Sequence, residues 1–160
     1  MKEEYKQFIA KAAADQEVIK KAFQKFRQKK PKDLDANFHS LHEKAFQKID
    51  CLQCANCCKT TSPIFRDVDV KRISKVLKMK EQQFVDQFLR RDEDGDLVLQ
   101  RSPCYFLGED NKCSIYEHRP LACREYPHTD RKNMYQILDL TQRNTLICPA
   151  VAKVVEEIIF

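Results

Sequence analysis

The chain has 160 residues, of which 42% are hydrophobic and 33% are charged, and its formal net charge is +5. This composition fits one soluble globular domain, and no apolar run approaches the ~20 residues that a membrane-spanning helix needs. The first residues, MKEEYKQFIAKAAADQE, lack the apolar segment of a signal peptide, so we expect a cytoplasmic protein. The net charge is too small to indicate nucleic-acid binding by itself.

Helices are expected at the start of the chain. Residues 3–28 predict one long helix, because apolar side chains recur at three- and four-residue steps. Its part from residue 20 to residue 30 has six basic residues and no acidic one. We interpret these as a solvated helix end favoured by the helix dipole, with a patch for an anionic protein partner as the alternative. Pro31 ends this helix, and a second helix over 33–50 is expected to pack against it as an antiparallel hairpin.

Two histidines of the second helix, His39 and His42, are three residues apart. That spacing suits a metal, but no third ligand is near in the sequence, so we interpret both as surface or half-buried side chains. Only two glycines occur, Gly95 and Gly108. The chain therefore lacks the glycine-rich phosphate loops of nucleotide-binding proteins and the nucleophile turn of serine hydrolases.

The remaining elements are short, and the pattern predicts a fold that is α+β and mostly α in a single domain. We divide that domain into a helical hairpin (1–50) and a cysteine-rich metal-chelating region (51–160). The expected elements, in order, are helices over 69–77 and 80–91, a turn at 92–96, a strand at 97–101, a β-hairpin over 104–116, a helical turn from Pro120, a strand over 134–140 and a closing helix from Pro149.

Eight cysteines are the most informative feature of the sequence. In a reducing compartment, clustered thiols are more often metal ligands or catalytic groups than disulfides. Four of them lie within CLQCANCC, residues 51–58, and all eight lie at expected element boundaries rather than inside apolar periodic runs, where inert core thiols occur. We therefore predict a set of eight metal ligands: Cys51, Cys54, Cys57, Cys58, Cys104, Cys113, Cys123 and Cys148.

The spacing leaves the metal open, because four thiolates suit zinc and an iron–sulfur cluster (4Fe–4S) equally well. Cys51, Cys54 and Cys57, followed at a distance by Cys148 and a proline, partly match the ferredoxin pattern. That grouping leaves a second set of four, Cys58, Cys104, Cys113 and Cys123. A single site with spare thiols is an equally simple interpretation.

The strings CLQCANCC, SPCYFL and NKCSIYEHRPLACREYPH resemble the YkgJ-type cysteine-cluster (CxxCxxCC) family, a zinc- or iron-chelating domain. The resemblance covers about Cys51 to Cys148 and implies metal chelation by the cysteines, with an iron–sulfur cluster in some relatives. The family also includes flagellin lysine methylases. Those are larger proteins, and this sequence shows no glycine-rich loop that would hold a methyl donor such as S-adenosylmethionine.

Four residues flanking the last cysteines are candidates for contacts around the site or with a substrate: Arg119, Arg124, Tyr116 and His128. An arginine could offset thiolate charge or bind an anionic group, or it could only hydrogen-bond nearby carbonyls and carboxylates. Tyr116 is expected to pack over the site. His128 is expected at the surface, with a role near the metal as the alternative.

Three functions remain open at the level of sequence. The first is a metal-cluster protein acting as a redox or enzyme component. The second is a zinc-stabilised binding module that contacts a protein partner through the basic residues 20–30. The third, a methylase-like protein-modifying enzyme, is ranked last. The sequence names no substrate or reaction.

Overall fold

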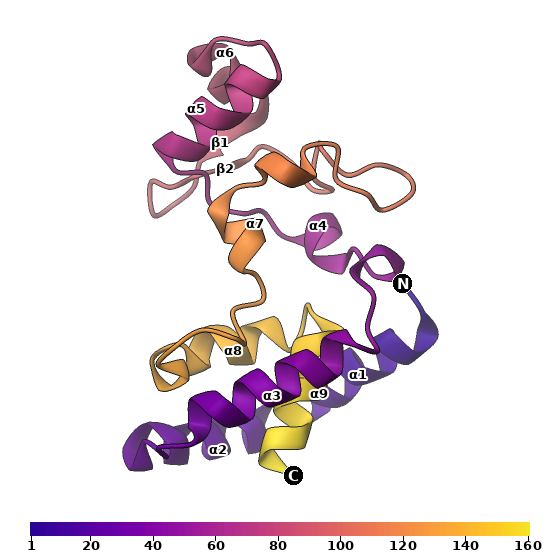
Figure 1. Cartoon of the computed structure of the whole chain (residues 1–160), viewed down its shortest axis with the longest axis vertical. Helices are drawn as coiled ribbons and strands as arrows, with labels where there is room; N and C mark the ends of the chain where they lie inside the picture. The colour runs from indigo at the N-terminus through magenta and orange to yellow at the C-terminus, as the bar shows by residue number, and fades with distance from the viewer. The chain divides into compact units, whose positions relative to one another are not determined.

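The computed structural model describes residues 1–160 and divides into two compact units (Figure 1). The first, which we call the helical unit, comprises residues 1–54 and 127–160, and the second, the inserted unit, comprises residues 55–126. The structure is mostly helical with one two-stranded sheet, which confirms the predicted fold class. None of its helices is long and apolar enough to cross a membrane.

The helical unit is built around its last helix, α9, which packs against helices from both ends of the chain. Figure 1 shows α9 alongside α1 and α3. Val151, Val154 and Val155 of α9 are fully buried, and this three- and four-residue spacing is the one that predicted the closing helix. The elements of the unit are α1 (Glu3–Ala14), α2 (Gln16–Lys29), α3 (Leu34–Phe46), η1 (Cys51–Gln53), η3 (Met134–Gln136), α8 (Leu138–Asn144) and α9 (Pro149–Ile159).

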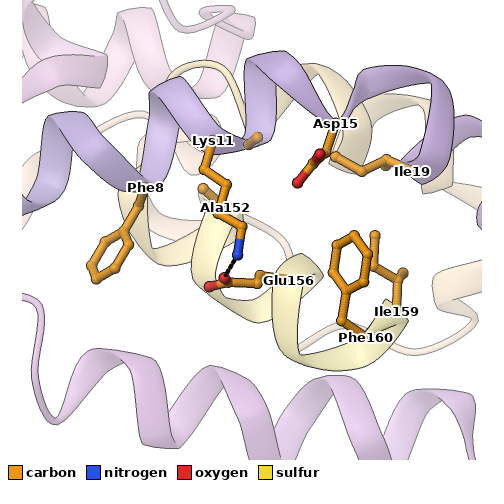
Figure 2. Close-up of a pocket in the computed structure, with 9 residues that line it drawn as sticks. Phe8, Lys11, Asp15, Ile19, Ala152, Glu156, Ile159 and Phe160 are labelled. Atoms are coloured by element: carbon orange, nitrogen blue, oxygen red, sulfur yellow. Dashed lines mark hydrogen bonds and ion pairs between the residues drawn. The ribbon is translucent and has the colours of Figure 1, made fainter.

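An ion pair joins the first and last helices at the edge of this core. Figure 2 shows Lys11 of α1 reaching Glu156 of α9, beside the aromatic ring of Phe160. The Lys11 ammonium also lies 5.8 Å from the centre of that ring. The cavity between these side chains measures only about 10 Å³, which is room for no more than one water molecule. The contact therefore closes the helical core and offers no ligand site.

Two sequence predictions in this unit are wrong in detail. The single helix over 3–28 is two helices that meet at Asp15, whose φ and ψ of −93° and 10° are not helical. Aspartate competes for backbone hydrogen bonds and is a poor residue for a helix interior. The strand predicted over 134–140 is helical, as η3 followed by α8. Met134 and Leu138, four residues apart, are both fully buried, and this helical spacing overrides the local preference for a strand.

The inserted unit combines short helices with the sheet. Strand β2 confirms the strand predicted at 97–101, and the register pairs Leu89 with Leu99 and Arg91 with Leu97. Gly95, with φ of 84°, forms the turn between the strands, where Asp92 accepts backbone hydrogen bonds from Asp94 and Asp96. The elements are α4 (Asn56–Thr60), α5 (Asp67–Val76), α6 (Glu81–Phe88), β1 (Leu89–Arg91), β2 (Leu97–Leu99), η2 (Tyr116–His118) and α7 (Leu121–Glu125).

Two predicted boundaries in this unit also change. The helix predicted over 80–91 ends at Phe88, because the next three residues pair with β2 instead. The β-hairpin predicted over 104–116 contains a single bridge, between Leu107 and Cys113, and no regular strand. The observed hairpin is therefore β1–β2, and the 104–116 segment is a hydrogen-bonded loop.

Aromatic side chains form the core of the inserted unit. Phe84 is fully buried, and its ring centre lies 5.3 Å from that of Phe88, 6.0 Å from that of Phe65 and 6.3 Å from that of Phe106. Since Phe106 lies two residues after Cys104, this core supports the loop that carries Cys104. The core of α6 thus fixes the position of a cysteine that is distant in sequence.

We expect Phe84→Ala to lower the free energy of unfolding by about 4 kcal/mol, because it removes a buried ring and leaves a cavity among three others. Urea unfolding followed by circular dichroism would measure this. Val68→Ala is the matched control, since Val68 is 57% exposed on neighbouring α5. A Phe84→Ala variant as stable as Val68→Ala would contradict the packing described.

Candidate metal centre

The cysteines separate between the two units. Cys57, Cys58, Cys104, Cys113 and Cys123 belong to the inserted unit. The helical unit holds the other three: Cys51, Cys54 and Cys148. Within the inserted unit, Cys58 lies on α4, Cys123 on α7, and Cys104 and Cys113 in the loop between β2 and η2. Three separate segments thus contribute these four thiols, two of which come from the loop, in addition to the thiol of Cys57 next to Cys58.

Backbone hydrogen bonds connect the first two of these segments, α4 and the loop. The N–H of Cys104 donates to the carbonyl of Cys58 over 2.8 Å, which ties the loop to α4. Within the loop, the N–H of Ser114 donates to the carbonyl of Phe106, and a bridge pairs Leu107 with Cys113, so the residues after Cys104 lie against the residues around Cys113. Backbone hydrogen bonds thus hold Cys104 and Cys113 in a loop that also packs on the aromatic core through Phe106.

The two loop cysteines also share a local geometry. The backbone N–H groups two residues further on donate hydrogen bonds to the two sulfurs, that of Phe106 to Cys104 and that of Ile115 to Cys113. These bonds favour the thiolate forms. Burial nevertheless dominates and raises the pKa of both Cys104 and Cys113. Such N–H groups stabilise the negative charge of sulfur and tune the metals that sulfur holds.

Cys123 is positioned by a buried ion pair on α5. The Asp69 carboxylate is fully buried and accepts a 2.7 Å bond from the Arg72 guanidinium and a 3.3 Å bond from the N–H of Leu121, the first residue of α7. Arg72 also donates to the carbonyl of Arg119 over 2.8 Å. The chain on either side of Pro120, which lies three residues before Cys123, is thereby fixed to α5.

Sequence analysis missed this ion pair. Asp69 and Arg72 are three residues apart on a predicted helix, a spacing that allows an ion pair on one face. Nothing in the sequence distinguishes them from the many solvated charges of the chain. What sets them apart is burial, which results from the packing of α5 against η2 and the residues that follow it.

The four dispersed thiols of the inserted unit interact electrostatically. Burial raises the pKa of Cys123 to about 12, and the charges of Cys58, Cys104 and Cys113 add to that effect. Cys58 differs, because a hydrogen bond from the Cys57 thiol, 4.0 Å away, lowers its pKa to about 7. Cys58 is therefore the thiol of the set that ionises most readily, and its charge opposes ionisation of the other three.

Arg119 is the cation shared by this set. Its charge acts to lower the pKa of Cys58, Cys113 and Cys123. The guanidinium lies 3.5 Å from the centre of the Tyr116 ring and donates to the Tyr116 carbonyl over 2.7 Å. Tyr116 itself is 54% exposed, so it orients the arginine and does not seal off solvent.

The other predicted flanking residues lie on α7 and in the helical unit. Arg124 is exposed on α7, and His128 lies in the helical unit with a left-handed φ of 67°. His39 contacts the carbonyl of Arg131, and His42 contacts the hydroxyl of Thr129 over 2.7 Å. Both histidines hold the returning chain to α3, and both are half-buried, one of the two placements expected for them.

The three cysteines of the helical unit lie at the ends of two elements, η1 and α9. Cys51 begins η1 and is exposed, Cys54 follows η1 and is buried, and Cys148 immediately precedes α9. Burial raises the pKa of Cys148 to about 12, the N–H groups of Val151 and Ala150 oppose this, and the charges of Cys51 and Cys54 add to it. This second group of thiols thus also interacts electrostatically.

Nowhere in the structure do three or more His, Cys, Asp or Glu side chains already converge to hold a metal ion. The chemistry of the inserted unit nevertheless fits one. It provides four soft sulfur donors within range of one another's charges, N–H groups that favour thiolates at Cys104 and Cys113, and a cation at Arg119. Four thiolates are a common ligand set for zinc and for iron–sulfur clusters.

Comparison with known proteins agrees with this chemistry. Residues 50–148 match the CxxCxxCC family, described as a "Putative zinc- or iron-chelating domain". The chain belongs to the CxxCxxCC family. An uncharacterized protein of Methanocaldococcus jannaschii is 30% identical over 82 residues, which cover 49% of this chain and 44% of that protein. The chain thus aligns with less than half of that relative. No solved structure matches the chain.

We expect Asp69→Asn to lower the free energy of unfolding of the metal-free protein by about 3 kcal/mol, because Arg72 then lacks its buried partner. Burial acts to raise the pKa of Asp69, but hydrogen bonds from Arg72, Arg66 and Leu121 outweigh it, so the pKa lies below its ordinary value. The stabilisation is therefore complete above pH ~4 and is lost as the pH falls through the lowered pKa.

Urea unfolding at pH 7 and at pH 3, with a chelator present, tests this expectation. The difference between the wild type and Asp69→Asn should shrink at the lower pH, since only the wild type loses a charge. Asp67→Asn is the control, because Asp67 is an exposed carboxylate in the first turn of the same helix. An equal effect of the two substitutions would contradict the role of Asp69.

Proposed function

We propose that the inserted unit is the metal-binding part of this CxxCxxCC protein and that Cys58, Cys104, Cys113 and Cys123 are its ligands. The observation that carries the proposal is the electrostatic interaction of these four thiols within one compact unit. Cys104 and Cys113 are held by one loop, Cys58 by its backbone bond to Cys104, and Cys123 by the Asp69–Arg72 pair.

A bound cation offsets the repulsion among the four thiols in their ionised form. Burial and mutual repulsion oppose their ionisation, whereas a metal binds only the thiolate form and so shifts each ligand toward it. Cys58 is the first ligand to ionise, because its pKa is already near neutral. Arg119 then offsets part of the negative charge that four thiolates leave around a divalent ion.

Four thiolates around zinc complete its tetrahedral shell, and sites closed in this way are structural. A 4Fe–4S cluster is also held by four thiolates, and it would transfer electrons, with its potential set by the nearby charge and by hydrogen bonds to sulfur. Arg119 and the loop N–H groups would favour the reduced form of such a cluster. The proposed function is therefore metal chelation, with a redox role if the bound group is an iron–sulfur cluster.

Metal analysis of protein purified without oxygen separates these two cases. A zinc protein is colourless and contains no acid-labile sulfide, whereas a cluster gives a brown protein with iron and sulfide. We expect Cys58→Ser and Cys123→Ser each to lose the metal of the inserted unit, because serine is a poor ligand for both. Amide hydrogen exchange should then increase in residues 102–126.

Cys148→Ser is the matched control for these variants, since Cys148 belongs to the helical unit. It should leave amide exchange of residues 102–126 as slow as in the wild type. Metal retained by Cys58→Ser and Cys123→Ser, or exchange raised equally by Cys148→Ser, would contradict the proposed ligand set.

A second candidate function is a metal-stabilised module that binds an acidic protein partner through α2. The exposed side chains of Lys20, Lys21, Lys25 and Lys29 carry this candidate. Two basic residues of 20–30 are already engaged within the protein. Arg27 pairs with Asp139, and the Lys30 ammonium lies 5.1 Å from the centre of the Tyr135 ring. Lys21, Lys25 and Lys29 follow one another at four-residue steps, so these three lie on one face of α2.

A fluorescent poly-glutamate peptide is a probe for this surface. We expect the double substitution Lys21→Gln and Lys25→Gln to weaken its binding about tenfold at low salt, from the loss of two attractive charges. The control is Lys71→Gln with Lys75→Gln, which removes two exposed lysines of α5 in the inserted unit. Equal weakening by both pairs would mean that only net charge matters and would refute a specific surface.

A further inference from the structure

We propose that the outer edge of strand β1, together with the cavity beside it, binds an extended peptide segment of a partner protein, which adds to the sheet as an antiparallel strand. The edge and the cavity both lie within the inserted unit. The peptide carries a central apolar residue, acidic residues on either side of it and basic residues one position further out. This inference goes beyond metal chelation and involves none of the cysteines.

The cavity is the first observation. It measures about 420 Å³, within the range of ~300–1,000 Å³ that ligand pockets occupy. Its apolar lining comes from Val70 of α5, Val85 of α6 and Leu97 of β2. Charged residues also line it: Asp67, Glu81, Arg90 and Arg91. The cavity can therefore take an apolar side chain whose neighbours lie among charges.

The second observation is a residue of β1 whose backbone groups lack partners. The N–H of Asp92 donates to the carbonyl of Asp96 over 2.9 Å, so this pair at the end of the β1–β2 ladder is hydrogen-bonded. Hydrogen-bonded and non-hydrogen-bonded pairs alternate along an antiparallel ladder. Arg91, opposite Leu97, therefore directs its N–H and C=O away from β2, where neither group has a hydrogen-bond partner.

The protein itself closes the other end of this edge. The N–H of Leu89 donates to the carbonyl of Val85 in α6, and the Leu89 carbonyl accepts from the Gln100 side chain over 2.9 Å. Arg90 and Arg91 both line the cavity, although successive side chains of a strand point to opposite faces. The cavity therefore reaches the edge of β1 as well as one face of the sheet, at the end that is left open.

A single residue of an added strand can use both features. If it exchanges two hydrogen bonds with Arg91, its side chain lies on the same face of the sheet as the side chains of Arg91 and Leu97. On that face, Leu97 lines the cavity together with Val70 and Val85. Peptides that add to a sheet edge gain affinity from the main chain and specificity from such a side-chain pocket.

The charges around the edge favour a peptide over a second copy of this chain. Pairing of two β1 edges brings arginines of both copies together, which is unfavourable. The Arg90 guanidinium, on the opposite face from Arg91, forms no hydrogen bond or ion pair, so it attracts acidic residues next to the central one. The carboxylates of Asp67 and Glu81 are likewise unpaired and attract basic residues two positions from the centre, on the cavity face.

The test is an NMR titration of the nitrogen-15-labelled full chain with the peptide acetyl-Lys-Glu-Leu-Glu-Lys-amide in the millimolar range. We expect the Arg91 amide resonance to shift and its exchange with solvent to slow about tenfold, because this N–H gains a partner. The Arg90 amide, which faces β2, is the internal control. An Arg91 amide that stays unshifted and exchanges as fast as before overturns the proposal. Protection that rises with protein concentration alone also overturns it, since the edge then pairs with a second copy.

Matched peptides separate the contributions to binding. Acetyl-Glu-Lys-Leu-Lys-Glu-amide has the same composition and net charge, and we expect it to bind about tenfold more weakly because its charges face like charges. N-methylation of the leucine removes the donor to the Arg91 carbonyl, and alanine in place of leucine removes the apolar side chain. Each change should also weaken binding about tenfold. Equal affinity of all four peptides indicates non-specific contact and overturns the proposal.

Variants of the protein test the same contacts from the other side. Arg90→Gln, and Asp67→Asn combined with Glu81→Gln, should each weaken peptide binding about threefold at low salt, as the loss of exposed charge pairs does. The control is Glu109→Gln with Glu125→Gln, which removes two exposed carboxylates of the same unit that do not line the cavity. All five residues are exposed, so the variants should fold, and circular dichroism verifies this. Equal weakening by the control pair overturns the assigned charges.

Discussion

Burial of several thiols in one small unit, reinforced by their mutual repulsion, opposes thiolate formation in the inserted unit. In the inserted unit, the charge of Cys58 opposes ionisation of Cys104, Cys113 and Cys123. A fold that brings such groups together without a cation keeps most of them protonated. Arg119 and the backbone N–H groups reduce the conflict but do not remove it. A thiophilic metal that binds the thiolates offsets the rest of the unfavourable free energy of ionising them. The folding of the unit and its affinity for metal are therefore coupled.

Because the four proposed ligands come from three segments, the supports of these segments decide whether the site can form. The loop cysteines depend on backbone bonds and on the aromatic core at Phe106. Cys123 depends on Asp69 and Arg72, which bind the chain just before α7. Neither Asp69 nor Arg72 has any metal-binding chemistry of its own. They matter because a short helix such as α7 has little intrinsic stability and takes its position from tertiary contacts.

The predictable parts of this protein are those with local signals. The closing helix follows from the spacing of Val151, Val154 and Val155, and the cysteine spacing predicts the metal chemistry of the family. The segment over 134–140 and the residues after Phe88 were misassigned, because burial of Leu138 and pairing with β2 override local preference. The grouping of thiols by unit could not be chosen from the sequence, since it depends on long-range packing of α5 and α9.

The boundary between the units falls inside the CxxCxxCC motif, between Cys54 and Ala55. Ala55 has φ of 49°, a left-handed conformation that costs a residue with a Cβ atom about 1 kcal/mol. Strain of this kind persists where neighbouring structure fixes the backbone on both sides. Here η1 is anchored through Asp50 on one side. On the other side, the carbonyl of Cys58 accepts a hydrogen bond from the N–H of Cys104. One short motif thus gives thiols to two separate cores, and a ligand bound by either group would stabilise the unit that holds it.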